Sequence, residues 1–296
     1  MLKWFNHLIK NDHRGPEVSK DISRLFNSWP LNLKSVNARI IKGYDGQNQI
    51  QLRLDCGILQ MYLDGRPDGL KPHKCQTLLE YLQRQADEID NDIEDDVESS
   101  VTPRRAWLEL DREMTQFYHR RLALLTVAQK SQEENNDELA RNCYRKAAYD
   151  AEYTLRAMDY IREHSKDEDH IEVHERFRPF VLWHWTIALT QQKIIDKDFD
   201  LAVEQVKQGM GNIAKVYEDH GITKWLKHDP SMAELKTLEK QLRKRYGIAA
   251  TLQEQLQSAL ASENYENAAK IRDQLKAKGR FPVPKRKVVS GNNSGF

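Results

Sequence analysis

The feature that most constrains this chain is a helical periodicity that fills the middle of the sequence. From Pro103 to about Tyr246, apolar residues recur about every 3.6 residues, as they do on one face of an amphipathic helix. The 296 residues include only 13 Gly and 9 Pro, so residues that end a helix are scarce. The sequence therefore predicts a series of long helices that bury their apolar faces against one another.

The helical segment contains a weak internal repeat of helix pairs. An aromatic-rich helix, the polar turn "SQEENND" and a helix rich in small residues are followed by the same order in "FVLWHWTIALTQQKII", "DKDFD" and "LAVEQVKQGMGNIAKVY". Setting Ala140 beside Ala202 aligns the two pairs at a spacing of about 62 residues. This packing resembles that of tetratricopeptide proteins, whose stacked hairpins present a concave surface to partners. We therefore expect residues 103–246 to form a tetratricopeptide-like array of helical hairpins.

Residues 35–64 show a period of two instead. Apolar and polar residues alternate on both sides of the turn "YDGQN", and a further apolar run, "CGILQMYLDG", follows. Asp45–Gly46 suits the positive-φ positions of a tight turn, so the segment predicts an antiparallel hairpin and a third strand. Such a sheet has one apolar face, which we expect helices over residues 17–28 and 75–86 to cover. Residues 1–86 are therefore predicted to form a small α+β domain with antiparallel strands, and the fold class to be α+β, mainly α.

Three further segments are short or strongly polar. The run "DEIDNDIEDDVESS" predicts an acidic linker or a frayed helix end over residues 87–102; a divalent-cation loop is the alternative, but the internal Gly and ligand register of an EF-hand are absent. The Lys- and Arg-rich residues 279–296 predict a basic disordered tail. The start, "MLKWFNHLIK", predicts a short docking helix, with a membrane-surface anchor as the alternative.

Charge and cysteine content narrow the class of protein. The net charge is +1, so no overall field attracts the chain to nucleic acid or to anionic lipid, and any such role depends on a local patch. Cys56, Cys75 and Cys143 are odd in number and lack CxxC spacing, which argues against a disulfide framework and favours a reducing compartment. No stretch approaches the apolar length of a membrane span. We therefore expect a cytoplasmic protein without a membrane span.

No residue pattern predicts an enzyme of a familiar type. His170 and His174 lie one helical turn apart in "DHIEVHERF", but a zinc protease needs HExxH and no third ligand is indicated. We expect these two histidines to begin a solvated helix and to bind no metal. His184 stands between two tryptophans, which favours a packed aromatic face over a catalytic base. Neither a phosphate-binding loop nor a nucleophile set is found, so we expect no cofactor and no catalysis.

Residues 249–278 predict a third and much shorter helical hairpin. Asn264 is placed to cap the second helix, and about 30 residues bury little apolar surface on their own, so we expect the apolar stripe to need a second molecule as a cover. The alternative is a terminal helix pair that only caps the preceding helical array. Arg272 and Asp273 are adjacent and do not face one another on a helix, so we expect each to bond across the hairpin or to a partner. The stripes consist of Leu252, Leu256, Ala259 and Leu260 and of Tyr265, Ala268, Ala269, Ile271, Arg272 and Leu275.

These residues carry a family resemblance. The stretch "LQEQLQSALASENYENAAKIRDQL" resembles the UVR motif, which the repair proteins UvrB and UvrC share with some Clp-type chaperone ATPases and McsA-type kinase activators. The aromatic residue, the Ala pair and the Arg-Asp pair all fall in register. The resemblance implies a helical hairpin that pairs with another such hairpin through its apolar stripe, and it implies no chemistry. The block from Trp29 to Gly69 is in addition similar to the N-terminal block of bacterial proteins that end in this motif.

Two hypotheses for function follow. The first is a non-enzymatic adaptor that binds a protein partner or a second copy of the chain through its C-terminal UVR-type hairpin. The alternative is a DNA-repair or nucleic-acid-associated protein in which the hairpin and the basic tail act together. Salt separates the two, because phosphate contacts weaken steeply with salt and an apolar contact does not. The predicted contact residues are Leu252, Leu256, Tyr265, Ala268, Ala269, Ile271, Arg272, Asp273 and Leu275.

Overall fold

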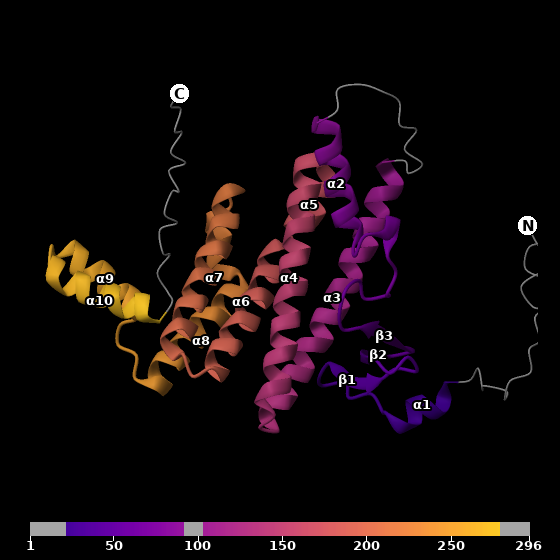
Figure 1. Ribbon diagram of the computed structural model, residues 1–296, viewed down its shortest axis with the longest axis horizontal. Coiled ribbons are helices and arrows are strands. Elements are labelled where there is room, and N and C mark those ends of the chain that lie inside the picture. Colours follow the sequence, from indigo (N-terminus) through magenta and orange to yellow (C-terminus); the bar gives the residue numbers. More distant parts are fainter. Residues whose placement is uncertain (1–21, 92–102, 279–296) are drawn as a thin grey trace, which may run out of the picture.

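The structure is a computed structural model that describes residues 22–91 and 103–278 (Figure 1). Its N-terminal part consists of α1 (Ser23–Ser28), β1 (Asn37–Lys42), β2 (Asn48–Leu54), β3 (Gly57–Tyr62), the short 3₁₀-helix η2 (Pro72–Lys74) and α2 (Leu78–Asn91). The rest is helical: α3 (Pro103–Glu133), α4 (Asp137–His164), α5 (Glu168–Glu175), α6 (Arg178–Ile195), α7 (Phe199–Asp219), the 3₁₀-helix η3 (Thr223–His228), α8 (Pro230–Tyr246), α9 (Leu252–Ala261) and α10 (Tyr265–Ala277). The fold is α+β and mainly α, as predicted.

Three of the sequence predictions fall wholly or mostly outside the described residues. These are the docking helix at the start of the chain, the basic tail over residues 279–296 and most of the acidic linker. Residues 87–91 of that predicted linker belong to α2. Within the described parts of the chain, none of the helices combines the length and the apolar character that crossing a membrane requires.

The three strands form an antiparallel sheet in the order β1-β2-β3, as the alternation predicts. Ile50 pairs with both Ile40 and Met61 across the sheet, which places these apolar side chains on one face. In the first turn only Gly46 takes a positive φ, of 76°, whereas Asp45 does not and instead accepts a hydrogen bond from the Gln47 N–H at 3.0 Å.

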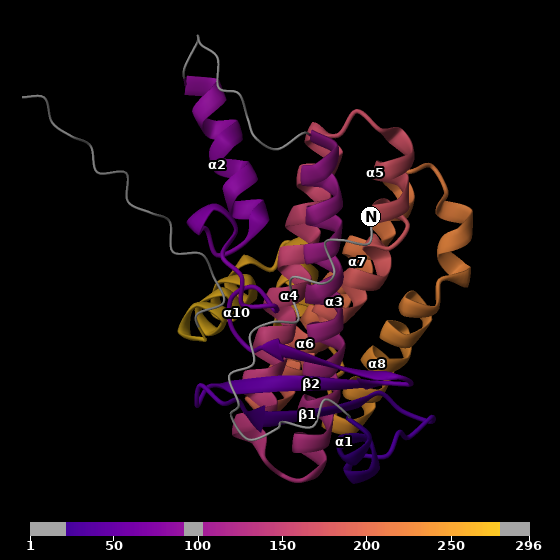
Figure 2. The same cartoon turned by 90° about the vertical axis from the view of Figure 1, so that its right-hand side faces the viewer.

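The apolar face of the sheet packs on α3 and α4 (Figure 2). Leu52 and Met61 share one core with Leu124 of α3 and Ala147 of α4. The expectation that residues 75–86 cover the sheet is therefore wrong. The long helices bury the sheet because they expose a wider apolar stripe than a single short helix, and α2 packs elsewhere, through Leu78 and its neighbours, on α3 and α4.

Helix α1 lies on the opposite, polar face of the sheet, so the expectation that residues 17–28 cover the apolar face is wrong as well. The Phe26 ring lies 3.9 Å from the Arg53 guanidinium, and the Trp29 ring, just after α1, lies 4.1 Å from that of Arg39. Both contacts are cation–π interactions. On this face Gln51 accepts a hydrogen bond from Arg39 and donates one to Gln60, each at 2.8 Å, so these polar side chains bond to one another.

Helices α3, α4, α6, α7 and α8 lie side by side, with the sheet beyond α3 at one end of the row and the α9/α10 hairpin beyond α7 and α8 at the other (Figure 1). Ala140 and Ala202, the two aligned positions of the internal repeat, are both fully buried. At the α6–α7 contact, a Cβ on Gly209 would overlap the Thr186 side chain. Small residues therefore let the helices approach closely, as the repeat predicts.

The turns of three hairpins, α3/α4, α6/α7 and α9/α10, share one geometry. The N–H of the helix-capping residue donates to a carbonyl five residues earlier, at 2.7, 2.9 and 2.8 Å for Asn136, Asp198 and Asn264. The side chain of each capping residue accepts the N–H three residues later. The residue before each cap has a positive φ of 55–60°. The turn of the terminal hairpin therefore has the same geometry as the turns of the other two hairpins.

Candidate functional site

The terminal hairpin begins with a capping box. Thr251 caps α9 by accepting the Glu254 N–H at 3.2 Å, and the Glu254 carboxylate accepts the Thr251 N–H at 2.8 Å. Asn264 caps α10 by accepting the Asn267 N–H at 3.1 Å, as predicted. Both helices therefore begin at positions set by their own local sequence.

The two helices enclose a small core of their own. It consists of Leu256, Ala259, Ala268, Ile271 and Leu275, each less than a tenth exposed, with Leu252 packed against it at its edge. All members come from α9 or α10, whereas the other three cores join residues of several helices. In the described residues, the hairpin is therefore a unit with a separate hydrophobic core.

This arrangement corrects the expectation of an uncovered stripe. Leu256, Ala268, Ile271 and Leu275 do not face outward, because the stripe of each antiparallel helix is covered by the stripe of the other. These residues form the core that holds the two helices together. Their part in contact with a partner stays a prediction.

A different set of side chains remains accessible on the hairpin. Tyr265 is 66% exposed and Leu260 is 50% exposed, and they lie on either side of the turn between α9 and α10. Tyr265, Ala269 and Arg272 are spaced by four and three residues, so they share one face of α10. Ala269 is half-buried. We call Leu260, Tyr265, Ala269 and Arg272 the tip face.

Arg272 and Asp273 are both exposed, with side-chain exposures of 46% and 66%. Contrary to expectation, they form an ion pair with each other, with 3.6 Å between Arg272 Nε and Asp273 Oδ1, and Asp273 also lies 3.8 Å from Lys276 Nζ. Neither bonds across the hairpin, so an exposed and weak ion pair borders the tip face.

Polar contacts at the start of α9 attach the hairpin to the array. Glu254 accepts hydrogen bonds from Lys207 Nζ of α7 at 2.6 Å and from Arg243 Nη2 of α8 at 2.7 Å. Thr251 donates to Glu204, and the Leu252 N–H donates to Asp200 at 3.1 Å. Partial burial alone would raise the pKa of Glu254, but the hydrogen bonds from Arg243, Lys207 and Thr251 lower it to about 2.

Comparison with known protein families identifies the sequence motif that forms this hairpin. The family model for the UvrB/uvrC motif matches residues 248–279, which include all of α9 and α10. The chain therefore carries a UVR motif, as its residues predict. No match to the chain was found among curated proteins or among solved structures. The similarity of the Trp29–Gly69 block to the N-terminal block of other proteins with this motif stays a prediction.

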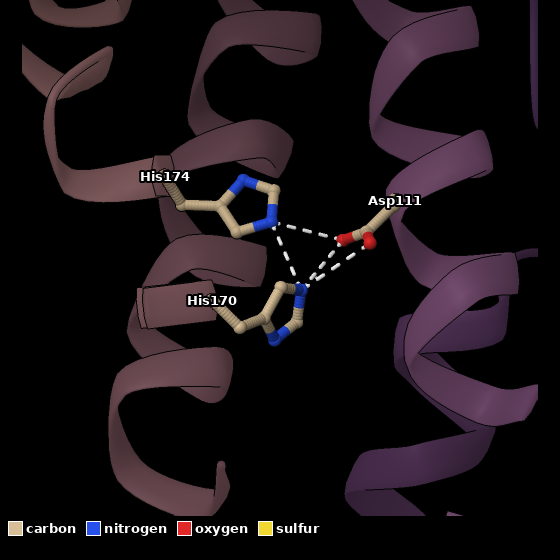
Figure 3. Close-up of side chains that lie close together, drawn as sticks. All are labelled: Asp111, His170 and His174. Carbon is tan, nitrogen blue, oxygen red and sulfur yellow. Dashed lines mark hydrogen bonds and ion pairs between the residues drawn. The ribbon is translucent and has the colours of Figure 1, made fainter. Parts of the chain in front are cut away.

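A second cluster lies far from the hairpin, between α3 and α5 (Figure 3). His170 and His174 of α5 both direct Nε2 at Asp111 of α3, at 3.0 and 2.9 Å from Asp111 Oδ1, and the two Nε2 atoms are 3.2 Å apart. Burial alone would raise the pKa of Asp111, but hydrogen bonds from His174 and His170 hold it below its ordinary value. The two imidazoles and the carboxylate thus converge on one point.

The expectation of a solvated helix start at His170 and His174 is therefore wrong. Their side chains are only 16% and 15% exposed, and Asp111 supplies a third group that could hold a metal ion together with them. The sequence shows the histidine pair at helical spacing, but Asp111 precedes it by 59 residues. Only the packing of α5 against α3 brings the carboxylate to the pair, so the local pattern could not reveal it.

His184 is packed as expected. Its side chain is buried, with ring centroids 4.3 Å from Phe180 and 4.8 Å from Trp183. Burial, together with the nearby charge of Arg121, lowers the pKa of His184 to about 3. The ring is therefore neutral at ordinary pH.

Proposed function

We propose that this chain is a non-enzymatic adaptor that docks a protein through the tip face of its UVR hairpin. The observation that carries the proposal is the match of residues 248–279 to the UvrB/uvrC motif on a hairpin that has its own core and a polar attachment to the array. A unit attached in this way can project a surface without disturbing the cores behind it.

The partner that fits the tip face best is a second UVR-type hairpin, either on another copy of this chain or on another protein. Leu260 and Tyr265 offer apolar area at the turn, Ala269 lets a second helix approach, and Arg272 offers a charge at the border. The helical array then serves as the scaffold that holds the hairpin. Three free cysteines, of which Cys56 is exposed, support the cytoplasmic location that forms part of the proposal.

The proposal is tested with a pair of variants of matched charge. Tyr265→Asp puts a carboxylate into the tip face, whereas Asn267→Asp puts one into the same first turn of α10 away from it. Both additions act alike on the helix dipole, so they differ mainly in the surface that they alter. Self-association of the full chain is measured by analytical ultracentrifugation, and partners are captured from native cells with each variant as bait.

We expect Tyr265→Asp to weaken dimerisation or partner capture at least about tenfold, which corresponds to one apolar anchor of an interface, and Asn267→Asp to leave both unchanged. Equal behaviour of the two variants would overturn the proposal. A gel-shift series with single-stranded and duplex DNA tests the alternative. Binding that weakens steeply between low and moderate salt and ignores Tyr265→Asp would favour the nucleic-acid function instead.

A further inference from the structure

The Asp111, His170 and His174 cluster has the donor set of a metal site. Two imidazole nitrogens and one carboxylate oxygen are ligands that zinc and its first-row neighbours accept in proteins. The three donor atoms come from two helices, α3 and α5, which fix their directions. His170 and His174 are one turn apart on α5, so both rings reach the same side of the helix.

The spacing of the donor atoms fits a single ion. Ligands about 2.1 Å from a metal lie about 3.0 Å apart at right angles and about 3.4 Å apart at tetrahedral angles. The separations here are 2.9, 3.0 and 3.2 Å. Three donors at these distances surround one position that is close to bonding distance from each of them.

The surroundings favour a cation that arrives from solution. Asp111 is 33% exposed and the two histidines are about half as exposed, so the donors are held in place and are still reached by solvent. Three acidic residues at the start of α5, Asp167, Glu168 and Asp169, and one basic residue, Lys166, line an open hollow together with Trp107, whose ring centroid is 5.9 Å from that of His170. Asp167 also caps α5 by accepting the His170 N–H at 3.1 Å, which fixes the first turn.

We propose that Asp111, His170 and His174 bind one divalent transition-metal ion, with Zn²⁺ as the ion that best suits this donor set. Three protein ligands leave at least one coordination position for water or for another ligand. The ion joins the short helix α5 to α3, which already meet here through the Trp107–His170 ring contact and the hydrogen bonds to Asp111. Binding therefore stabilises the α3–α5 contact.

The test uses the full chain, treated with a chelator and titrated with Zn²⁺ and with Co²⁺. We expect isothermal titration calorimetry to show a site that the variants His170→Gln and Asp111→Asn weaken at least about tenfold, since even the loss of an outer-sphere partner costs that much in other proteins. Co²⁺ gives visible absorption bands that should appear with the wild type and disappear with both variants. Zn²⁺ should raise the melting temperature of the wild type and not that of the two ligand variants.

His228→Gln is the control, because His228 is an exposed histidine of η3 that belongs to no such cluster. Circular dichroism of the metal-free variants checks that they are folded, and the use of two different ligand positions guards against failure of either one. Equal Zn²⁺ affinity and equal Co²⁺ spectra in the wild type and both ligand variants would overturn the proposal. The cluster would then be a hydrogen-bonded set of side chains only.

Discussion

The α6/α7 and α9/α10 hairpins have the same turn but different surroundings. In both, a capping residue follows a residue of positive φ and its N–H reaches back five residues. Helices α6 and α7 then join a core that includes α8, and α6 also packs on α4. Helices α9 and α10 pack on each other alone and touch the array through charged and polar groups.

The two hairpins have different surroundings because the outward faces of their helices differ in composition, whereas their turns are alike. α6 is apolar around most of its circumference, so it packs on both sides, whereas the outward positions of α9 and α10 are mostly Gln, Glu, Asn, Lys and Arg. A local turn signal therefore predicts a hairpin, and the composition of its second face decides whether the hairpin is built into an array or stands apart. The following predictions test this distinction.

Matched Ile→Ala substitutions should have the largest and most divergent effects. Ile213 of α7 and Ile271 of α10 are both buried, and Ile→Ala costs about 2–5 kcal/mol in a packed core. Ile213→Ala should lower the temperature of the main calorimetric transition, which reports the unfolding of the helical array. Ile271→Ala should leave that transition in place and speed hydrogen exchange over residues 252–277 alone. An equal lowering of the main transition in both variants would show that the array and the hairpin unfold as one cooperative unit.

Gly209→Ala should destabilise the array by about 1–3 kcal/mol, because the added methyl group overlaps Thr186. Thr186 donates to the Leu182 carbonyl at 2.7 Å, which limits its freedom to move aside. Urea unfolding measures the effect. Gly211→Ala is the control, since a Cβ there meets no atom within 4 Å and should not destabilise α7. Equal destabilisation by the two substitutions would argue against a close α6–α7 contact.

Lowering the pH should reduce the free energy of unfolding of the array, because His184 takes up a proton only when the array unfolds. The same effect should not reach the hairpin. Unfolded histidine takes up a proton near pH 6.5, whereas burial keeps the folded His184 neutral down to about pH 3. The unfolded state therefore binds more protons between these values, and stability falls as pH falls. Relative to His184→Gln, the wild-type array should lose about 1 kcal/mol between pH 7 and 5.5 in urea unfolding.

Residues 248–278 contain no histidine, so hydrogen exchange in the hairpin should show no such difference between the wild type and His184→Gln. An equal pH dependence of array stability in both proteins would contradict the burial of a neutral ring.

Glu254→Gln should have the smallest effect on stability, under about 1 kcal/mol, because the carboxylate is one quarter exposed and its ion pairs are screened. It should nevertheless widen the distribution of distances between the hairpin turn and α7, measured by paired spin labels. Glu266→Gln, which removes an exposed ion pair with Lys270 inside α10, should leave that distribution unchanged. Identical distributions in all three proteins would show that Glu254 does not attach the hairpin.

Much of the fold was predictable because its signals are local. The strand alternation, the Asn264 cap, the aligned alanines and the UVR motif all lie within short stretches. The helices that cover the sheet were not predictable, because no pattern in the sequence of α3 distinguishes the side that faces the sheet. Asp111 was missed for a similar reason, since its role arises only where α5 packs on α3. The burial of Leu256 inside the hairpin was not predictable, because one apolar stripe suits a partner and the other half of the hairpin equally well.

Native-state hydrogen exchange of the wild-type chain tests the separate hairpin most directly. At increasing, sub-denaturing urea, amides of α9 and α10 should open at a lower free energy than the buried amides of α4, α6 and α7, and should open together as one group. A single opening free energy shared by both regions would contradict a hairpin that stands on its own core.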